Sequence, residues 1–108
     1  MPTYTVKYSN FNLSQKQKNL IANDITIIHS KCTGANTFFA QVIFQKNEKN
    51  SHYMGGKLIK TQEIFLNGQI RAGRTSKIKR KLILGLRKIL IKNTRVKKDC
   101  VWVYLDDL

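Results

Sequence analysis

An amino-terminal proline is the first feature of this sequence that could carry chemistry. The chain opens Met1-Pro2, and removal of the initiator methionine would leave Pro2 with a free secondary amine. Inside a chain the proline nitrogen is an amide without basicity, whereas a terminal α-amino group has a pKa of about 7.7–8.0. Burial and neighbouring cations favour the neutral, basic form. Pro2 is therefore a candidate acid/base group, although an ordinary chain start also fits the Met-Pro pair taken alone.

Four further side chains could complete a site for a small acid. Arg71 and Arg74 lie at the entry to the second expected helix and, if that turn is helical, would clamp a carboxylate. His29 falls on the edge of the buried stripe of the first helix, and Tyr104 lies in an apolar strand. Each also has an ordinary interpretation: a core histidine with a hydrogen-bond partner, two solvated cations, and a structural tyrosine.

The first half of the chain predicts a strand, a helix and a second strand. Residues 2–8 alternate, with Tyr4 and Val6 on one face. Ser14 or Asn12 can cap a helix over about 14–31, and Thr33-Gly34 can end it. Residues 38–45 are mostly apolar, which predicts a second strand in the centre of a sheet.

The second half predicts a small hairpin, a helix and a closing strand. Tyr53-Met54 is a short edge strand that turns at Gly55-Gly56. Asn67-Gly68, after the apolar residues 64–66, is the dipeptide most typical of a two-residue hairpin turn. Thr75-Ser76 caps a second amphipathic helix whose outer face is crowded with Lys and Arg, and residues 101–105 close the chain as a strand.

This order favours one α/β domain over residues 1–108. Both helices connect strands, so parallel strand pairs with right-handed crossovers are expected. Ser14 to Val42 and Thr75 to Val103 each span about 28 positions, which indicates two copies of a β-α-β unit. The units cover about 2–45 and 63–105, with a hairpin region at about 52–70. No glycine-rich phosphate loop follows the first strand, so a doubly wound nucleotide-binding fold is not expected.

The charge balance selects anionic partners. The chain has 20 Lys+Arg against 6 Asp+Glu, a formal charge of +14. Nucleic acid, acidic membrane surfaces and carboxylate metabolites would all be attracted. A basic face on the second helix and the loop after it could bind nucleic-acid phosphates, or it could simply be a solvated outer face. Its residues are Lys77, Lys79, Arg80, Lys81, Arg87, Lys88, Lys92, Arg95, Lys97 and Lys98.

The remaining composition predicts a cytoplasmic protein without a cofactor. Cys32 and Cys100 are too few and too far apart for a disulfide framework or a zinc site. No apolar run is long enough to span a membrane, and the polar start lacks the apolar region of a signal peptide.

Taken together, these residues resemble the tautomerase superfamily, and within it the group typified by cis-3-chloroacrylic acid dehalogenase. The resemblance covers nearly the whole chain. It implies a homotrimer of duplicated β-α-β protomers, each an α+β sandwich with a four-stranded main sheet, two helices on one face and a small hairpin. Pro2 would lie at the bottom of a cationic pocket. The matching segments are Pro2, Ala-Asn-Asp-Ile-Thr-Ile-Ile-His (22–29), Thr-Gly (33–34), Phe-Ala-Gln-Val (39–42), Gly-Gln-Ile-Arg-Ala-Gly-Arg (68–74) and Trp-Val-Tyr (102–104).

The resemblance also implies roles. Pro2 would be the acid/base group, Arg71 and Arg74 would hold a substrate carboxylate, His29 would polarise or orient the substrate, and Tyr104 would position water or a substrate oxygen. Family members that add water use a glutamate beyond the last strand. No glutamate follows Tyr104 here, only Asp106, Asp107 and two leucines.

We therefore expect a tautomerase acting on a small 2-oxo or enol carboxylate. Three alternatives remain open at this stage: a cofactor-free dehalogenase or hydratase of an unsaturated acid, a basic nucleic-acid-binding protein, and a pseudoenzyme of the same fold.

Overall fold

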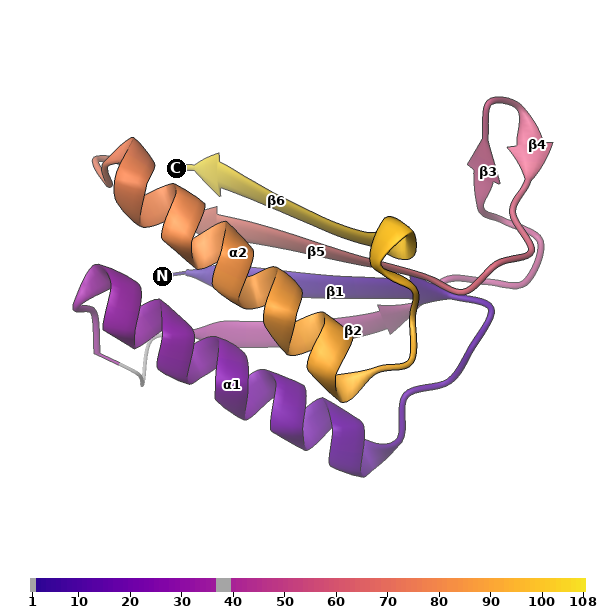
Figure 1. The fold of residues 1–108 in the computed structure, drawn as a ribbon, viewed down its shortest axis with the longest axis horizontal. Coiled ribbons are helices and arrows are strands. Elements are labelled where there is room, and N and C mark those ends of the chain that lie inside the picture. Colours follow the sequence, from indigo (N-terminus) through magenta and orange to yellow (C-terminus); the bar gives the residue numbers. More distant parts are fainter. Residues whose placement is uncertain (1, 37–39) are drawn as a thin grey trace.

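A mixed four-stranded sheet carries both helices on one of its faces (Figure 1). The computed structural model describes residues 2–36 and 40–108. The elements in chain order are β1 (Thr3–Ser9), α1 (Gln15–Thr33), β2 (Gln41–Lys46), β3 (Tyr53–Met54), β4 (Lys57–Leu58), β5 (Glu63–Ile70), α2 (Ser76–Asn93), the 3-10 turn η2 (Lys98–Cys100) and β6 (Val101–Asp107).

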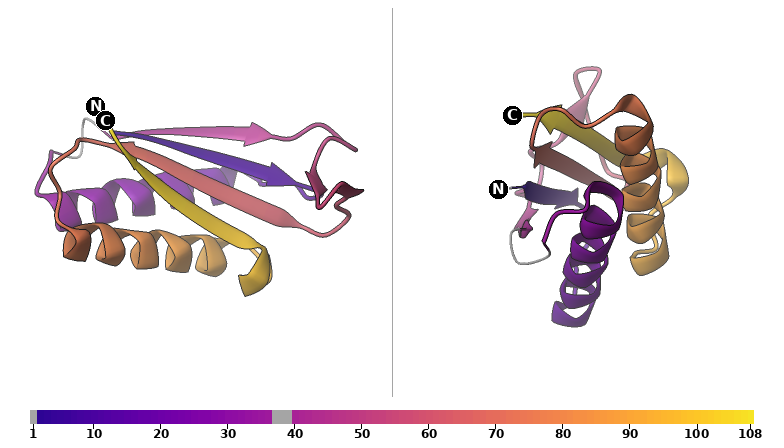
Figure 2. Two further views of the ribbon diagram at one scale, coloured as in Figure 1. Left: turned by 90° about the horizontal axis from the view of Figure 1, so that it is seen from above. Right: turned by 90° about the vertical axis from the view of Figure 1, so that its left-hand side faces the viewer.

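The sheet joins the two β-α-β units through their first strands. Its order is β2-β1-β5-β6, with β1 parallel to β2, β5 parallel to β6, and β1 antiparallel to β5. The parallel crossovers predicted from the element order are confirmed. The views in Figure 2 show α1 and α2 side by side under the sheet, while its other face carries no helix. We call this helix-free side the open face.

The predicted central position of the second strand is wrong. β2 is an edge strand, and β1 and β5 occupy the centre. The apolar run that suggested burial on both sides begins at Phe38 and Phe39, which lie outside the described residues. The described strand alternates instead, with Ile43 exposed and Phe44 half-buried against the core.

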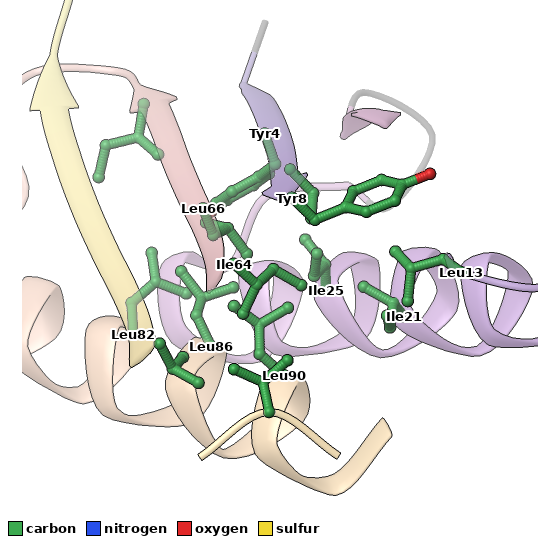
Figure 3. Packing of buried hydrophobic residues seen from close by; sticks show 14 residues of the cluster. Tyr4, Tyr8, Leu13, Ile21, Ile25, Ile64, Leu66, Leu82, Leu86 and Leu90 are labelled. Atoms are coloured by element: carbon green, nitrogen blue, oxygen red, sulfur yellow. The ribbon is translucent and has the colours of Figure 1, made fainter. Parts of the chain in front are cut away.

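The core fills the space between the sheet and the helices (Figure 3). The alternation expected in β1 is confirmed, because Tyr4, Val6 and Tyr8 are buried while Lys7 is exposed. Fully burying one such aliphatic or aromatic side chain stabilises a fold by roughly 1.5–3 kcal/mol. Ile21 and Ile25 of α1, Ile64 and Leu66 of β5, and Leu82, Leu86 and Leu90 of α2 complete this layer.

Both helices begin at the capping residues that the sequence indicates. The Ser14 hydroxyl accepts from the backbone N–H of Gln17, and the Gln17 side chain accepts from the Ser14 N–H, which completes a capping box. Gly34 ends α1 with a φ of 74° in the left-handed region. Thr75 caps α2 through the N–H of Ile78. These local signals fix where α1 ends and α2 begins.

The hairpin turn predicted at Asn67-Gly68 is wrong. β5 runs unbroken through both residues, and Gly68 is paired with Tyr4 on one side and Leu105 on the other. The hairpin is β3–β4, where Gly55 and Gly56 both have positive φ, as expected for its tight turn. Within the described residues, neither helix is long and apolar enough to cross a membrane.

Candidate active site

The start of β1, the end of α1 and the loop between β5 and α2 meet at one end of the molecule (Figures 1 and 2). The Pro2 carbonyl accepts from the Gln41 N–H at 3.0 Å, which ties Pro2 to the first residue of β2. On the other side Thr3 is paired with Gln69, two residues before Arg71. The sheet therefore brings Pro2 and Arg71 to the same end of the two central strands, although they are far apart in sequence.

His29 lies in the last turns of α1 and is only 2% exposed. Its Nδ1 is 2.6 Å from the hydroxyl oxygen of Tyr4, and the two rings meet edge to face with centroids 5.6 Å apart. Burial lowers the pKa of His29, and the positive charge of Arg74 lowers it further. Burial raises the pKa of Tyr4, to which Cys32 adds. The pair is thus held as neutral imidazole and neutral phenol.

Arg74 links the loop before α2 to the end of α1. Its Nη1 donates to the carbonyl oxygen of Thr33 at 3.1 Å, which satisfies a carbonyl in the last turn of α1. Its Nε is buried, and none of the described residues accepts from it. Arg71 is exposed. The guanidinium groups of both arginines remain available in part: that of Arg71 to solvent, and that of Arg74 through the N–H groups that do not bond to Thr33.

The arginines do not lie on a helical turn, so the condition under which the sequence favours a clamp is not met. Residues 71–75 form a loop in which Gly73 has a φ of 102°, and α2 starts only after the Thr75 cap. A left-handed residue cannot continue a right-handed helix, so the spacing of the two arginines is set by this loop.

Tyr104 lies on the other side of the sheet. It is 48% exposed on the open face, and its ring stacks on Phe65 with centroids 6.2 Å apart and planes 11° apart. No described residue hydrogen-bonds to its hydroxyl. A single protomer therefore does not bring Tyr104 to His29, which lies between α1 and the opposite, helix-covered face of the sheet. A cavity of about 300 Å³ adjoins it on the open face, lined by Thr5, Lys7, Phe65, Asn67 and Tyr104.

The two aspartates near the end of the chain have partners. The Asp106 carboxylate accepts from the side-chain amide of Asn67 at 3.0 Å, and the Asp107 carboxylate pairs with the Lys79 ammonium at 3.0 Å. Throughout residues 2–36 and 40–108, no three His, Cys, Asp or Glu side chains are arranged to hold a metal ion.

Tyr4 is the residue of this site that sequence reasoning did not single out. Strand alternation placed it on the buried face, and a hydrogen-bond partner was expected for a buried histidine. Nothing local joins two residues that lie 25 positions apart. The Thr33 carbonyl that holds Arg74 was likewise not foreseen, because a backbone acceptor leaves no mark in the sequence.

Comparison with solved structures supports the fold. The chain superimposes on native Ps01740 with a TM-score of 0.91 and 26% identity, over 98% of this chain and 93% of that one. N1, a member of the cis-3-chloroacrylic acid dehalogenase family, gives a TM-score of 0.91 with 22% identity, over 98% and 74% of the two chains. A symmetric trimer of wild-type fused 4-OT gives 0.86 with 20% identity, over 98% and 85%.

Comparison with protein families is more direct. No curated protein matches the sequence. The family model described as a putative oxalocrotonate tautomerase enzyme matches residues 1–107, nearly the entire chain. Together with the fold, this match shows that the chain belongs to the oxalocrotonate tautomerase-like family within the tautomerase superfamily.

Proposed function

We propose that this protein is a tautomerase in which the amine of Pro2, freed by removal of Met1, moves a proton within a small 2-oxo or enol carboxylate. The observation that carries the proposal is that Pro2, at the start of β1, lies at the same end of the fold as Arg71, Arg74 and the buried His29. Membership of the family supports the reaction class.

In the proposed reaction the guanidinium groups of Arg71 and Arg74 hold the substrate carboxylate. Their charges, with desolvation, disfavour protonated Pro2, so the neutral nitrogen acts as the base. It takes the proton of the enol hydroxyl, which leaves an enolate and a protonated amine. Positive charge around the site stabilises this enolate. The amine then delivers the same proton to carbon, which yields the 2-oxo acid and restores neutral Pro2.

Isomerisation is favoured over hydration because the two aspartates that follow Tyr104 in the sequence are already bonded to other side chains. Adding water to an unsaturated acid needs a second base to activate that water. Asp106 and Asp107 are the acids nearest to Tyr104 in sequence, and they are occupied by Asn67 and Lys79. A proton shuttle through one amine needs no such base.

The open face of the sheet supports assembly into the trimer seen for fused 4-OT. A protomer leaves Ile43 39% exposed there, and Tyr104 is 48% exposed beside Phe65, whose ring also stacks on Trp102. In the proposed assembly Tyr104 serves the site of a neighbouring protomer, since its own site lies across the sheet. Ile43→Asp, which would place a charge in this face without touching the buried core, should give a monomer by light scattering. Exposed Leu20→Asp on α1 is the matched control and should leave the mass unchanged.

The test of function is ketonisation of an arylenolpyruvate or a dienol diacid, followed by absorbance. One preparation begins at Pro2, verified by intact mass, and a second keeps one residue ahead of it. Positioned acid/base groups contribute about 10²- to 10⁴-fold, so the extended form should be slower by at least about a hundredfold. Arg71→Gln should raise KM, whereas Lys77→Gln on exposed α2 should not. Equal rates for the two amino termini, or no ketonisation above the uncatalysed rate, would rule the proposal out.

A further inference from the structure

The hydrogen bond between Tyr4 and His29 determines which ring nitrogen of the imidazole carries the proton. A neutral histidine carries its proton on either Nδ1 or Nε2, and the partner of one nitrogen decides which. The Nδ1 of His29 is 2.6 Å from the Tyr4 hydroxyl, and no other hydrogen bond to that hydroxyl is found among the described residues. The contact is buried, since Tyr4 is 0% and His29 2% exposed.

Only one arrangement of protons satisfies this contact. If Nδ1 carried the proton and donated it, the phenol proton would have no acceptor within the described residues. An unsatisfied buried donor costs about 1–3 kcal/mol. If the phenol donates to a bare Nδ1, the phenol and Nδ1 are both satisfied and the imidazole proton lies on Nε2, which is not among the buried, unpartnered side-chain atoms of the described residues.

Burial and, to a lesser degree, the neighbouring groups disfavour the two charged alternatives. Protonating His29 would put a second positive charge beside Arg74 in a buried site, and both effects lower its pKa. Ionising Tyr4 is opposed by burial and, less strongly, by Cys32, and both raise its pKa. Both shifts favour the neutral pair, in which the phenol keeps the proton that it donates to Nδ1.

We propose that Tyr4 is a positioning residue that fixes His29 as the Nε2–H tautomer, so that His29 acts as a neutral hydrogen-bond donor to the C2 oxygen of the substrate. This deepens the proposed tautomerase function and rests on it for the identity of the acceptor. In this role His29 stabilises the enolate oxygen and does not compete with Pro2 for the proton. Tyr4 acts only through His29 and is not itself a catalytic residue.

Nitrogen-15 NMR of histidine-labelled protein tests the assignment without turnover. The couplings of the ring protons to the two nitrogens distinguish the tautomers. The chain has two histidines, and His52→Gln identifies the signals of His29. We expect Nε2–H in the native protein at neutral pH. An Nδ1–H tautomer or an imidazolium there would overturn the inference, whatever any variant does.

Tyr4→Phe keeps the ring and removes the hydroxyl. Tyr8→Phe, in the same strand and on the same buried face, is the matched control. Tyr4→Phe should shift His29 toward a tautomer mixture and lower kcat roughly tenfold with little change in KM, as loss of one oriented hydrogen bond predicts. Tyr8→Phe should change neither. An unchanged tautomer in folded Tyr4→Phe would overturn the role of Tyr4. Native protein that shows Nε2–H but no ketonisation would retain the tautomer assignment and remove the proposed function instead.

Discussion

Gly68 of β5 lies directly against the ring of Tyr4 in β1. The two residues are paired across the antiparallel strands, and a Cβ atom at position 68 would lie 2.6 Å from Cε1 and 2.9 Å from Cδ1 of the tyrosine. It would also lie 2.7 Å from Cδ2 of Leu105 on the next strand. The missing side chain therefore leaves room for the ring that reaches His29.

Gly68→Ala should destabilise the fold by about 1–3 kcal/mol, because the added methyl overpacks the core between two neighbours that are themselves confined. The free energy of unfolding in urea measures this. Gln69→Ala, an exposed change in the same strand, should stay within about 0.5 kcal/mol of the native protein. Equal unfolding midpoints for all three proteins would show that the Tyr4 ring moves aside freely.

His29 should make stability depend on pH in the weakly acidic range. Burial and Arg74 lower its pKa in the folded protein from an ordinary value of 6.5. In weak acid the imidazole of His29 is therefore protonated more fully in the unfolded chain than in the folded one. The free energy of unfolding should then fall as pH drops below about 6.5. Urea unfolding between about pH 7.5 and 5 measures this slope.

The second histidine provides the control for that slope. His29→Gln should flatten it, although the variant is less stable at every pH, whereas His52→Gln should retain it. A native slope that survives in His29→Gln would show that another group titrates in this range.

Glu63 should stabilise the opposite end of the sheet. The residue is 3% exposed, and its carboxylate accepts from Trp102 Nε1 at 2.9 Å and the Thr61 hydroxyl at 2.7 Å. Burial raises the pKa of Glu63, but hydrogen bonds from Cys100, Trp102 and Thr61 and the charge of His52 outweigh it, so the pKa is lowered from 4.5. This stabilisation is present above about pH 4.5 and is lost as pH falls through the folded pKa.

Glu63→Gln tests that contribution. Hydrogen bonds to a charged group are worth about 1.5–3 kcal/mol, so the variant should lose about this much stability at neutral pH and approach the native protein in acid. The fluorescence of Trp102, the one tryptophan of the chain, follows unfolding. Exposed Glu48→Gln should have no effect. A deficit that does not shrink in acid would mean that the carboxylate charge is not what stabilises this end.

Local patterns predicted the parts of the fold that local physics decides. The Ser14 and Thr75 caps, the Gly34 end of α1 and the alternation of β1 each depend on a few adjacent residues. The pairing of strands does not. Asn67-Gly68 is a dipeptide typical of turns, yet here Gly68 leaves room for the ring of Tyr4 in the neighbouring strand. Long-range packing thus overrides the local preference.

Prediction of the site was limited in the same way, because it also depends on contacts between distant segments. Its residue types could be named, but Tyr104 alternates with Val103 and Leu105, and the sequence does not say which set faces the helices. Packing decides this, since Val103 and Leu105 contact the core and Tyr104 lies on the open face. Conversely, the approach of Tyr4 to His29 comes from the crossover that lays α1 on the sheet, which no single segment encodes.

The basicity of Pro2 is tested most directly by nitrogen-15 NMR of proline-labelled protein. The chain contains one proline, so a single resonance reports the amine. We predict a shift that titrates with a midpoint below the value of about 7.7–8.0 for an ordinary terminal amine, and a higher midpoint in Arg71→Gln. A resonance that does not move between about pH 5 and 10, as for an amide, or a midpoint unchanged by loss of Arg71, would contradict the account.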